Sequence, residues 1–419
     1  MSVAFANALS GLTSNATAIN IVSNNLANLN TTGYKNQQVS FEDLVNETLS
    51  GFTNSTSVSG STTSKGVQEF TQGTLQTTNN PFDAAIQGGG FFVLRGVTGQ
   101  ELLTRQGNFK VDSTGHLVTS GGQFVQGWNS QNAVLKTTGA TSDITIPTGL
   151  ALAPKATSEI ALSVNLNSNA VVGSTAGKFS SPIQVFDAQG NPHTLTITYT
   201  ESAVNAWSFD ITIPSADLTV GTGTTTSVGS GNVTFDGAGK MLTPALAGGT
   251  VPITITGLAT GATDMAVTWK LYDAAGNSTI TQNTAQSANL STKQDGYSSG
   301  QLNSFSIGAG GVVIAKFSNG ASQNVAQIAL ASVANPGSMQ QLGGNAWVPT
   351  NSTATPVVGV PSSGARGQIS GGALESSTVD IATEFTNLLQ YERGYQANSK
   401  VITTQDQIVQ ETIALISGR

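Results

Sequence analysis

The sequence predicts a multidomain α+β protein whose middle is mainly antiparallel β-sheet and whose N- and C-terminal α-helices pack as a coiled coil. Apolar residues repeat at helical spacing in the first and last parts of the chain. Between them, short alternating segments are separated by glycine-containing turn signals, which is typical of half-buried strands. Two shifts in composition divide this middle region, so we expect one β domain to be inserted in the other.

The C-terminal stretch, residues 377–419, carries the strongest helical signal. An apolar residue recurs there at every seventh position, which forms one stripe along a helix and favours winding against another helix. Phe385 and Ile413 each follow a member of that row by four positions, where a second core row would lie. Ser377 and Asp380 supply a helix-start signal. The row consists of Ile381, Leu388, Tyr395, Ile402, Val409 and Ile416.

The N-terminal segment carries an apolar row of the same kind. Residues 1–34 contain no charged side chain, and their many Asn, Ser and Thr, together with Gly11, are poorer helix formers than Ala. We therefore expect this helix to be stable only when its row is covered, with the C-terminal helix as partner. Two interpretations stay open: helices that close one ordinary domain, or arms that build a polymer. The row consists of Phe5, Leu9, Leu12, Ala16, Ile19, Ser23 and Leu26.

The composition narrows the class of protein. Charged residues make up only 9% of the chain, against about 25% in typical soluble domains. A net charge of −7 argues against nucleic acid, which requires a basic face. The absence of cysteine excludes thiol chemistry, and no apolar run approaches the roughly 20 residues that span a bilayer. The N-terminus lacks the features of a Sec signal, so we expect any export to follow another route.

The middle region reads as a series of turns and strands. Asn28 to Gly33 breaks the first helix, and FFVLR after Gly88 to Gly90 predicts a strand. The Asp-x-x-Gly pattern of a type I turn occurs four times, at Asp112, Asp187, Asp236 and Asp273. Asn319-Gly320 predicts a further hairpin, and residues 193–199 and 207–213 alternate like strands.

Composition shifts at residues 144–155 and 287–300 set the predicted domain boundaries. The predicted domains are a helical coiled-coil domain of residues 1–29 and 378–419, a linker or extended arm of residues 30–81 and 371–377, an inner β domain of residues 82–151 and 298–370, and an outer, inserted β domain of residues 152–297.

A search for catalytic chemistry finds no positive signal. The two histidines, His116 and His193, are far apart in sequence, and no short-spaced metal motif, phosphate loop or nucleophile elbow occurs. We therefore predict that the chain is not an enzyme, with no catalytic, metal-binding or cofactor-binding residue and no cofactor. The four tryptophans could stack on sugars, but core packing is the favoured role. They are Trp128, Trp207, Trp269 and Trp347.

Both ends of the chain resemble a known family. FANALSGLTSNATAINIVSNNLANLNTTGYK, residues 5–35, is similar to the N-terminal signature of bacterial flagellar rod and hook proteins. GGALESSTVDIATEFTNLLQYERGYQANSKVITTQDQIVQETIALI, residues 371–416, is similar to the other end of that family. GGGFFVL and LTRQGNFKVDSTGHLVTSGGQFVQGW resemble the first half of its shared β domain. Gly394 departs from the expected Ala, at a cost of about 1 kcal/mol in helix propensity.

Rod members of this family are shorter, and the block from about residue 152 to 297 resembles the additional outer domain of its hook members. The resemblance implies a structural subunit that self-assembles into a curved tubular universal joint and transmits torque from rod to filament. The implied assembly interface consists of the large apolar residues of the two rows together with two residues of the second core row: Phe5, Leu9, Leu12, Ile19, Leu26, Ile381, Phe385, Leu388, Tyr395, Ile402, Val409, Ile413 and Ile416. No catalytic residue is carried over.

The resemblance also implies partners and a location. The implied partners are further copies of this chain, the distal rod protein, the hook cap, the hook–filament junction proteins and the flagellar type III export apparatus. Neither nucleic acid nor membrane insertion is implied. The implied location is extracellular, in the basal body and hook, reached without a Sec signal peptide.

Two alternatives stay open. One is an enlarged distal rod protein, which would form a straight and stiff assembly. The other is a secreted β-rich carbohydrate-binding or adhesive protein, which would leave the two apolar rows without a purpose.

Overall fold

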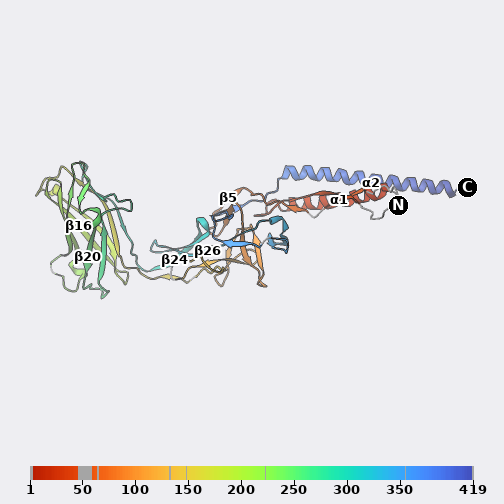
Figure 1. Ribbon diagram of the computed structural model, residues 1–419. Helices are drawn as coiled ribbons and strands as arrows, with labels where there is room; N and C mark the ends of the chain where they lie inside the picture. The colour runs from red at the N-terminus through yellow and green to blue at the C-terminus, as the bar shows by residue number, and fades with distance from the viewer. Residues whose placement is uncertain are drawn as a thin grey trace. The chain divides into compact units, whose positions relative to one another are not determined.

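The computed structural model describes residues 3–45, 59–63, 66–131, 134–147, 149–221, 223–353 and 355–417. The described chain is mainly β-sheet with one long α-helix near each end, so the predicted fold class is confirmed (Figure 1). The chain divides into two compact units. The first comprises Met1–Thr148, Ser304–Ala315 and Gln323–Arg419, and the second comprises Gly149–Asn303 and Lys316–Ser322. The finer division into four domains stays a prediction.

The two helices, α1 (Val3–Ala27) and α2 (Ile381–Ser417), lie side by side in the first unit (Figure 1). At 1.5 Å per residue, the 37 residues of α2 extend for about 56 Å. Asp380 starts this helix, because its Oδ1 accepts a hydrogen bond from the backbone N–H of Thr383 at 2.8 Å. The helix therefore begins at Ile381, and the expected Ser377 start signal lies outside it.

The segment after α1 forms short strands in antiparallel pairs, where the sequence predicted a linker or extended arm. β1 pairs with β4, β2 with β3, and β5 with a strand near the C-terminal helix, β32. The β2–β3 hairpin packs against α1, and the Phe41 ring of β2 lies 5.7 Å from that of Tyr391 on α2. The pairing satisfies backbone groups that an isolated linker would leave to water. The strands are β1 (Gln37–Gln38), β2 (Phe41–Val45), β3 (Ser59–Thr63), β4 (Val67–Gln68) and β5 (Leu75–Thr77).

The β part of the first unit is built on antiparallel strands around β7, which is the predicted FFVLR strand. Its core brings together Phe70, Phe91 and the fully buried Trp347, with ring centroids 5.5–5.8 Å apart. The strands of this part are β6 (Ala84–Gln87), β7 (Phe91–Arg95), β8 (Glu101–Thr104), β9 (Lys110–Val111), β10 (Leu117–Val118), β11 (Phe124–Asn129), β12 (Ser142–Asp143), β26 (Ser322–Ile328), β27 (Leu330–Ser332), β28 (Gln340–Gly343), β29 (Ala346–Val348), β30 (Val357–Gly359), β31 (Gln368–Gly371) and β32 (Ala373–Glu375). Segments in which the chain passes between units contain β13 (Ala151–Leu152), β24 (Gly300–Ile307) and β25 (Val312–Phe317).

The second unit consists of two five-stranded sheets around one apolar core. One sheet has the order β15-β16-β17-β18-β19, and the other has β20-β21-β14-β22 with β23 beside β14. Trp207 and Trp269 are fully buried in this core, which agrees with the favoured packing role. The strands are β14 (Glu159–Asn167), β15 (Lys178–Phe186), β16 (Pro192–Ala203), β17 (Ala206–Pro214), β18 (Thr225–Phe235), β19 (Met241–Thr243), β20 (Thr250–Ile255), β21 (Met265–Lys270), β22 (Ile280–Asn283) and β23 (Ala288–Gln294).

All four Asp-x-x-Gly turns form as predicted. In each, the glycine N–H donates to the carbonyl of the aspartate three residues earlier, at 3.0–3.1 Å. Each glycine has a φ between 77° and 86°, a region that favours glycine.

The turn that begins at Asp187 also carries a buried polar cluster. His193 lies between two carboxylates, with Nε2 3.4 Å from Asp187 and Nδ1 3.1 Å from Asp217. Burial alone would raise the pKa of Asp187, but hydrogen bonds from Asn191, Thr260 and His193 outweigh it and lower the pKa from 3.8 to about 2. The ionised form of Asp187 therefore stabilises the folded second unit.

We expect the second unit to lose stability as the pH falls from about 4 towards 2. A depressed folded-state pKa stabilises the fold fully above the unfolded-state pKa of 3.8, and this contribution disappears as the pH approaches about 2. Urea unfolding of the full chain at pH 5 and pH 2.5, followed by hydrogen exchange of β16 peptides, measures the loss. Asp187→Asn should reduce the difference between the two pH values. Asp236→Asn, the same substitution in an equivalent turn without a histidine, is the matched control, and an equal effect of both variants would contradict the assignment.

Candidate assembly interface

The two terminal helices pack together as predicted, but through a different face of α1. The residues of α1 that are buried are small or polar and recur at helical spacing: Ala8, Ser14, Ala18, Val22 and Asn25. None of them belongs to the predicted apolar row. The sequence analysis expected the C-terminal helix to cover the apolar row of α1. Pairing of the helices within one chain does not fully cover that row.

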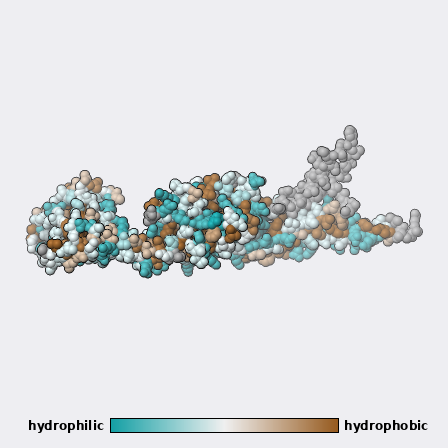
Figure 2. Space-filling model, turned by 90° about the horizontal axis from the view of Figure 1, so that it is seen from below, coloured by the Kyte–Doolittle hydropathy of each residue, from teal (hydrophilic) through white to brown (hydrophobic). Residues whose placement is uncertain are grey.

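Most of the predicted row is partly or largely exposed. On α1, Leu9 is 45% exposed, whereas Phe5, Leu12, Ile19 and Leu26 are half-buried. On α2, Ile381, Phe385, Tyr395, Val409 and Ile413 are between 37% and 60% exposed, whereas Leu388 and Ile402 are half-buried. The side chain of Ile416 lies outside the described side chains. Brown, hydrophobic residues are visible over the helix pair in Figure 2.

Glycines bring the two helices close together. A Cβ added to Gly394 would lie 2.7 Å from Oδ1 of Asn15, and one added to Gly11 would lie 2.7 Å from Nδ2 of Asn398. These two pairs show that the helices are antiparallel, since residue numbers fall along α2 as they rise along α1. Gly394 lowers the helix propensity of α2, but its missing side chain makes room for Asn15.

The exposed rows of the two helices lie on the same side of the pair. Leu12 follows the contact residue Gly11 by one position, and Tyr395 follows Gly394 in the same way. One residue corresponds to a rotation of about 100° around a helix. Because the helices are antiparallel, this rotation leads to the same flank on both. The helix pair therefore presents one apolar flank built from both ends of the chain.

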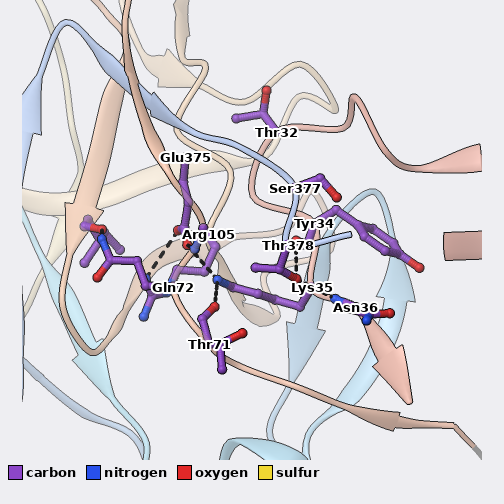
Figure 3. A network of polar contacts seen from close by, with 12 residues as sticks. Thr32, Tyr34, Lys35, Asn36, Thr71, Gln72, Arg105, Glu375, Ser377 and Thr378 are labelled. Atoms are coloured by element: carbon purple, nitrogen blue, oxygen red, sulfur yellow. Dashed lines mark hydrogen bonds and ion pairs between the residues drawn. The ribbon is translucent and has the colours of Figure 1, made fainter. Parts of the chain in front are cut away.

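A buried ion network holds the base of this helix pair (Figure 3). Glu375 is 1% exposed. Its Oε1 lies 2.6 Å from Nζ of Lys35, and its Oε2 lies 3.3 Å from Nη1 of Arg105. Its Oε1 also accepts the backbone N–H of Gly73 at 2.9 Å. Burial lowers the pKa of both Lys35 and Arg105, and the charge of Glu375 counteracts this in each case.

The remaining donors of the network bond to the backbone. Lys35 donates to the carbonyl of Thr71 at 2.5 Å, and Arg105 donates to the carbonyl of Gly88 at 2.9 Å. The carbonyl of Glu375 itself accepts the N–H of Gly33 at 2.8 Å. The network therefore joins the segment that follows α1, the segment that precedes α2, and the β domain between them.

Sequence reasoning did not assign these three charged residues to a site. The available signal was composition, because Lys35 is the first charged residue after 34 uncharged ones. A charge in so neutral a segment is a candidate for a specific partner. Its partner is 340 residues away in sequence, and no spacing rule could have supplied it.

Among the residues that the structure describes, no three His, Asp or Glu side chains come together in a group that could hold a metal ion. No helix that the structure describes is long and apolar enough to cross a membrane.

Comparison with protein families matches both helical ends and the β units. Residues 5–35 match the family described as Flagella basal body rod protein, and residues 370–415 match the Flagellar basal body rod FlgEFG protein C-terminal family. Residues 85–172 match the Flagellar hook protein FlgE/F/G D1 domain, and residues 165–297 match the Flagellar basal body protein FlaE D2 domain. Fold and families together define a structural, non-enzymatic protein of the flagellar rod and hook class.

Relatives that match along nearly the whole chain narrow this class. The chain is 33% identical to the flagellar hook protein FlgE of Salmonella typhimurium, over 99% of this chain and 100% of that one. It is 30% identical to the flagellar hook protein FlgE of Treponema pallidum, over 97% and 98% of the two chains. The chain belongs to the flagellar hook protein family, and the rod and carbohydrate-binding alternatives are not favoured. A crystal structure of the Helicobacter pylori hook protein FlgE2 matches with a TM-score of 0.47 and 16% identity, over 66% of this chain and 94% of that one.

We expect Glu375→Gln to destabilise the first unit by about 3–5 kcal/mol, because it leaves two buried cations without their carboxylate. Urea unfolding of the full chain measures the change, and hydrogen exchange of peptides that contain Lys35 and Arg105 locates it. Lys270→Met is the matched control, since the ion pair of Lys270 with Glu159 is about half exposed and is worth less than about 1 kcal/mol. Equal effects of the two variants would show that the buried network does not hold the base of the helices.

Proposed function

We propose that this chain is the hook subunit that polymerises into a curved tube and transmits torque from rod to filament. The observation that carries the proposal is the apolar flank of the helix pair. Within one chain the helices bury a face of mostly small and polar residues, and a row of large apolar side chains stays partly exposed beside it. Contiguous apolar surface of this kind marks an interaction site. Further copies of the same chain can cover it, because each copy carries the same flank.

The length of α2 supports contacts with more than one neighbour. The two contacts align Gly11 with Asn398 and Asn15 with Gly394. Continued towards the N-terminus of α1, the same alignment places Val3, the first described residue of α1, opposite residue 406. Val409 and Ile413 extend past the described end of α1 and stay exposed. In a polymer, this free end of α2 has its own apolar surface to place against another subunit.

The neutral surface suits a joint whose subunits change their spacing in every turn. Charged residues make up only 9% of the chain, so few ion pairs must be broken when outer surfaces move past one another. Separating desolvated charges is costly, whereas neutral polar contacts exchange readily with water. The packed helices hold the tube together, and the contacts between outer surfaces break and form again as the subunit spacing changes.

The proposal includes the partners and the location expected of such a subunit. The chain polymerises with itself in the flagellar hook and meets the distal rod protein, the hook cap and the hook–filament junction proteins at different stages of assembly. It reaches the extracellular side through the flagellar type III apparatus. Family membership supports these assignments. Export of this chain from cells in which Sec-dependent secretion is blocked tests the route.

We expect Ile19→Glu to abolish polymerisation while the β units keep their stability. Ile19 is half-buried on the apolar flank of α1, and an unpaired carboxylate there carries a desolvation cost of several kcal/mol in every subunit. Polymer yield by sedimentation, together with thermal melts of each variant, measures both quantities. Asn7→Glu, at an exposed position outside the row, should be much milder. Normal polymer from Ile19→Glu would exclude the flank as the assembly element.

A further inference from the structure

We infer that Gly11, Asn15, Gly394 and Asn398 form a register lock between the two terminal helices. The four residues make two matching modules, since each helix carries a glycine followed four positions later by an asparagine. The asparagine of each helix packs against the glycine of the other. The lock sets how far α1 is displaced along α2, and thereby which apolar side chains share the exposed flank.

The two contacts leave no room for a side chain at either glycine. At Gly394, a Cβ would meet all three terminal atoms of the Asn15 side chain within 3.2 Å. At Gly11, it would meet those of Asn398 within 3.0 Å. Real Cβ atoms essentially never lie closer than 3.0 Å to such atoms, so the asparagine would have to move.

Asn15 is not free to move away. Its Nδ2 donates to the carbonyl of Gly11 at 2.7 Å, which holds the amide against the helix axis and towards α2. The side chain has only two torsions, and another rotamer would break this hydrogen bond. Gly11 therefore serves both modules, because its missing side chain accommodates Asn398 and its carbonyl holds Asn15.

Other alignments of the same helix faces do not reproduce this fit. A slip of two turns in one direction would place Val401 opposite Asn15 and Gln405 opposite Gly11. The opposite slip would place Asn387 opposite Asn15 and Tyr391 opposite Gly11. Each slip puts a larger side chain where a glycine now stands. Polar residues at otherwise well-packed helix contacts are an established means of specifying register.

The register lock and helix propensity predict opposite effects of one substitution on assembly. Gly is the poorest helix former apart from Pro, so Gly394→Ala would favour an isolated helix. If Gly394 were only a tolerated defect, the substitution would improve helix formation and assembly. If Gly394 accommodates Asn15, the same substitution forces the helices apart or out of register. Asn15→Ala should then relieve the conflict, because every close atom at Gly394 belongs to the Asn15 amide group.

The test compares Gly394→Ala, Asn15→Ala and the double variant in full-length protein, and its assembly readout rests on the proposed function. We expect Gly394→Ala to raise the critical concentration for polymerisation by at least about tenfold, because overpacking a close contact is destabilising. Asn15→Ala in the Gly394→Ala background should restore most of the loss. Gly11→Ala with Asn398→Ala provides the same comparison for the second module. Gln390→Ala, at an exposed position of α2, is the control for substitution alone.

The outcomes separate the lock from the proposed function. Wild-type polymerisation by Gly394→Ala, or failure of the double variant to recover, would overturn the lock while Ile19→Glu still abolishes assembly. Normal assembly of Ile19→Glu would instead remove the proposed role of the apolar flank. Recovery in the double variant, with unchanged melting of the β units, is the result that the lock requires.

Discussion

The terminal part of this molecule depends on one buried carboxylate. Glu375 is shielded from water and neutralised by Lys35 and Arg105, and its backbone carbonyl also accepts a hydrogen bond from Gly33. A buried charge of this kind is stabilising only when its partners are all in place, and it is strongly destabilising when one is removed. The network therefore forces residues from three distant parts of the chain into one arrangement. The two helices leave the β domain from this point.

The helix pair that extends from this network has two faces with different kinds of side chains. The buried face of α1 carries Ala, Ser, Val and Asn, and Gly and Asn residues of both helices lie where the helices touch, which allows close approach. The neighbouring flank carries large apolar side chains that stay partly exposed, and the proposed association of copies would bury them. A chain that used its apolar row for internal pairing would have little left for its neighbours. Small residues inside and large residues outside therefore suit a subunit that must associate with copies of itself.

The two β units show how a nearly uncharged chain still holds a defined structure. Their cores are conventional, with fully buried aromatic and aliphatic side chains, and their turns use aspartate and glycine where the backbone requires them. Some of the buried charged groups lie in specific clusters, as His193 does with Asp187 and Asp217. These clusters place charge at specific positions of the fold.

The sequence alone determined the elements of this protein. Periodicity located both helices, and Asp-x-x-Gly spacing located four turns, because these features depend on neighbours a few residues apart. Tertiary structure decided which helix face points inward, since Gly11 and Gly394 have no visible role until Asn398 and Asn15 lie against them. It also decided that Lys35, Arg105 and Glu375 meet. An apolar row in a sequence predicts that a face will be buried, but not whether the same chain or another copy buries it, because both bury the same surface from water.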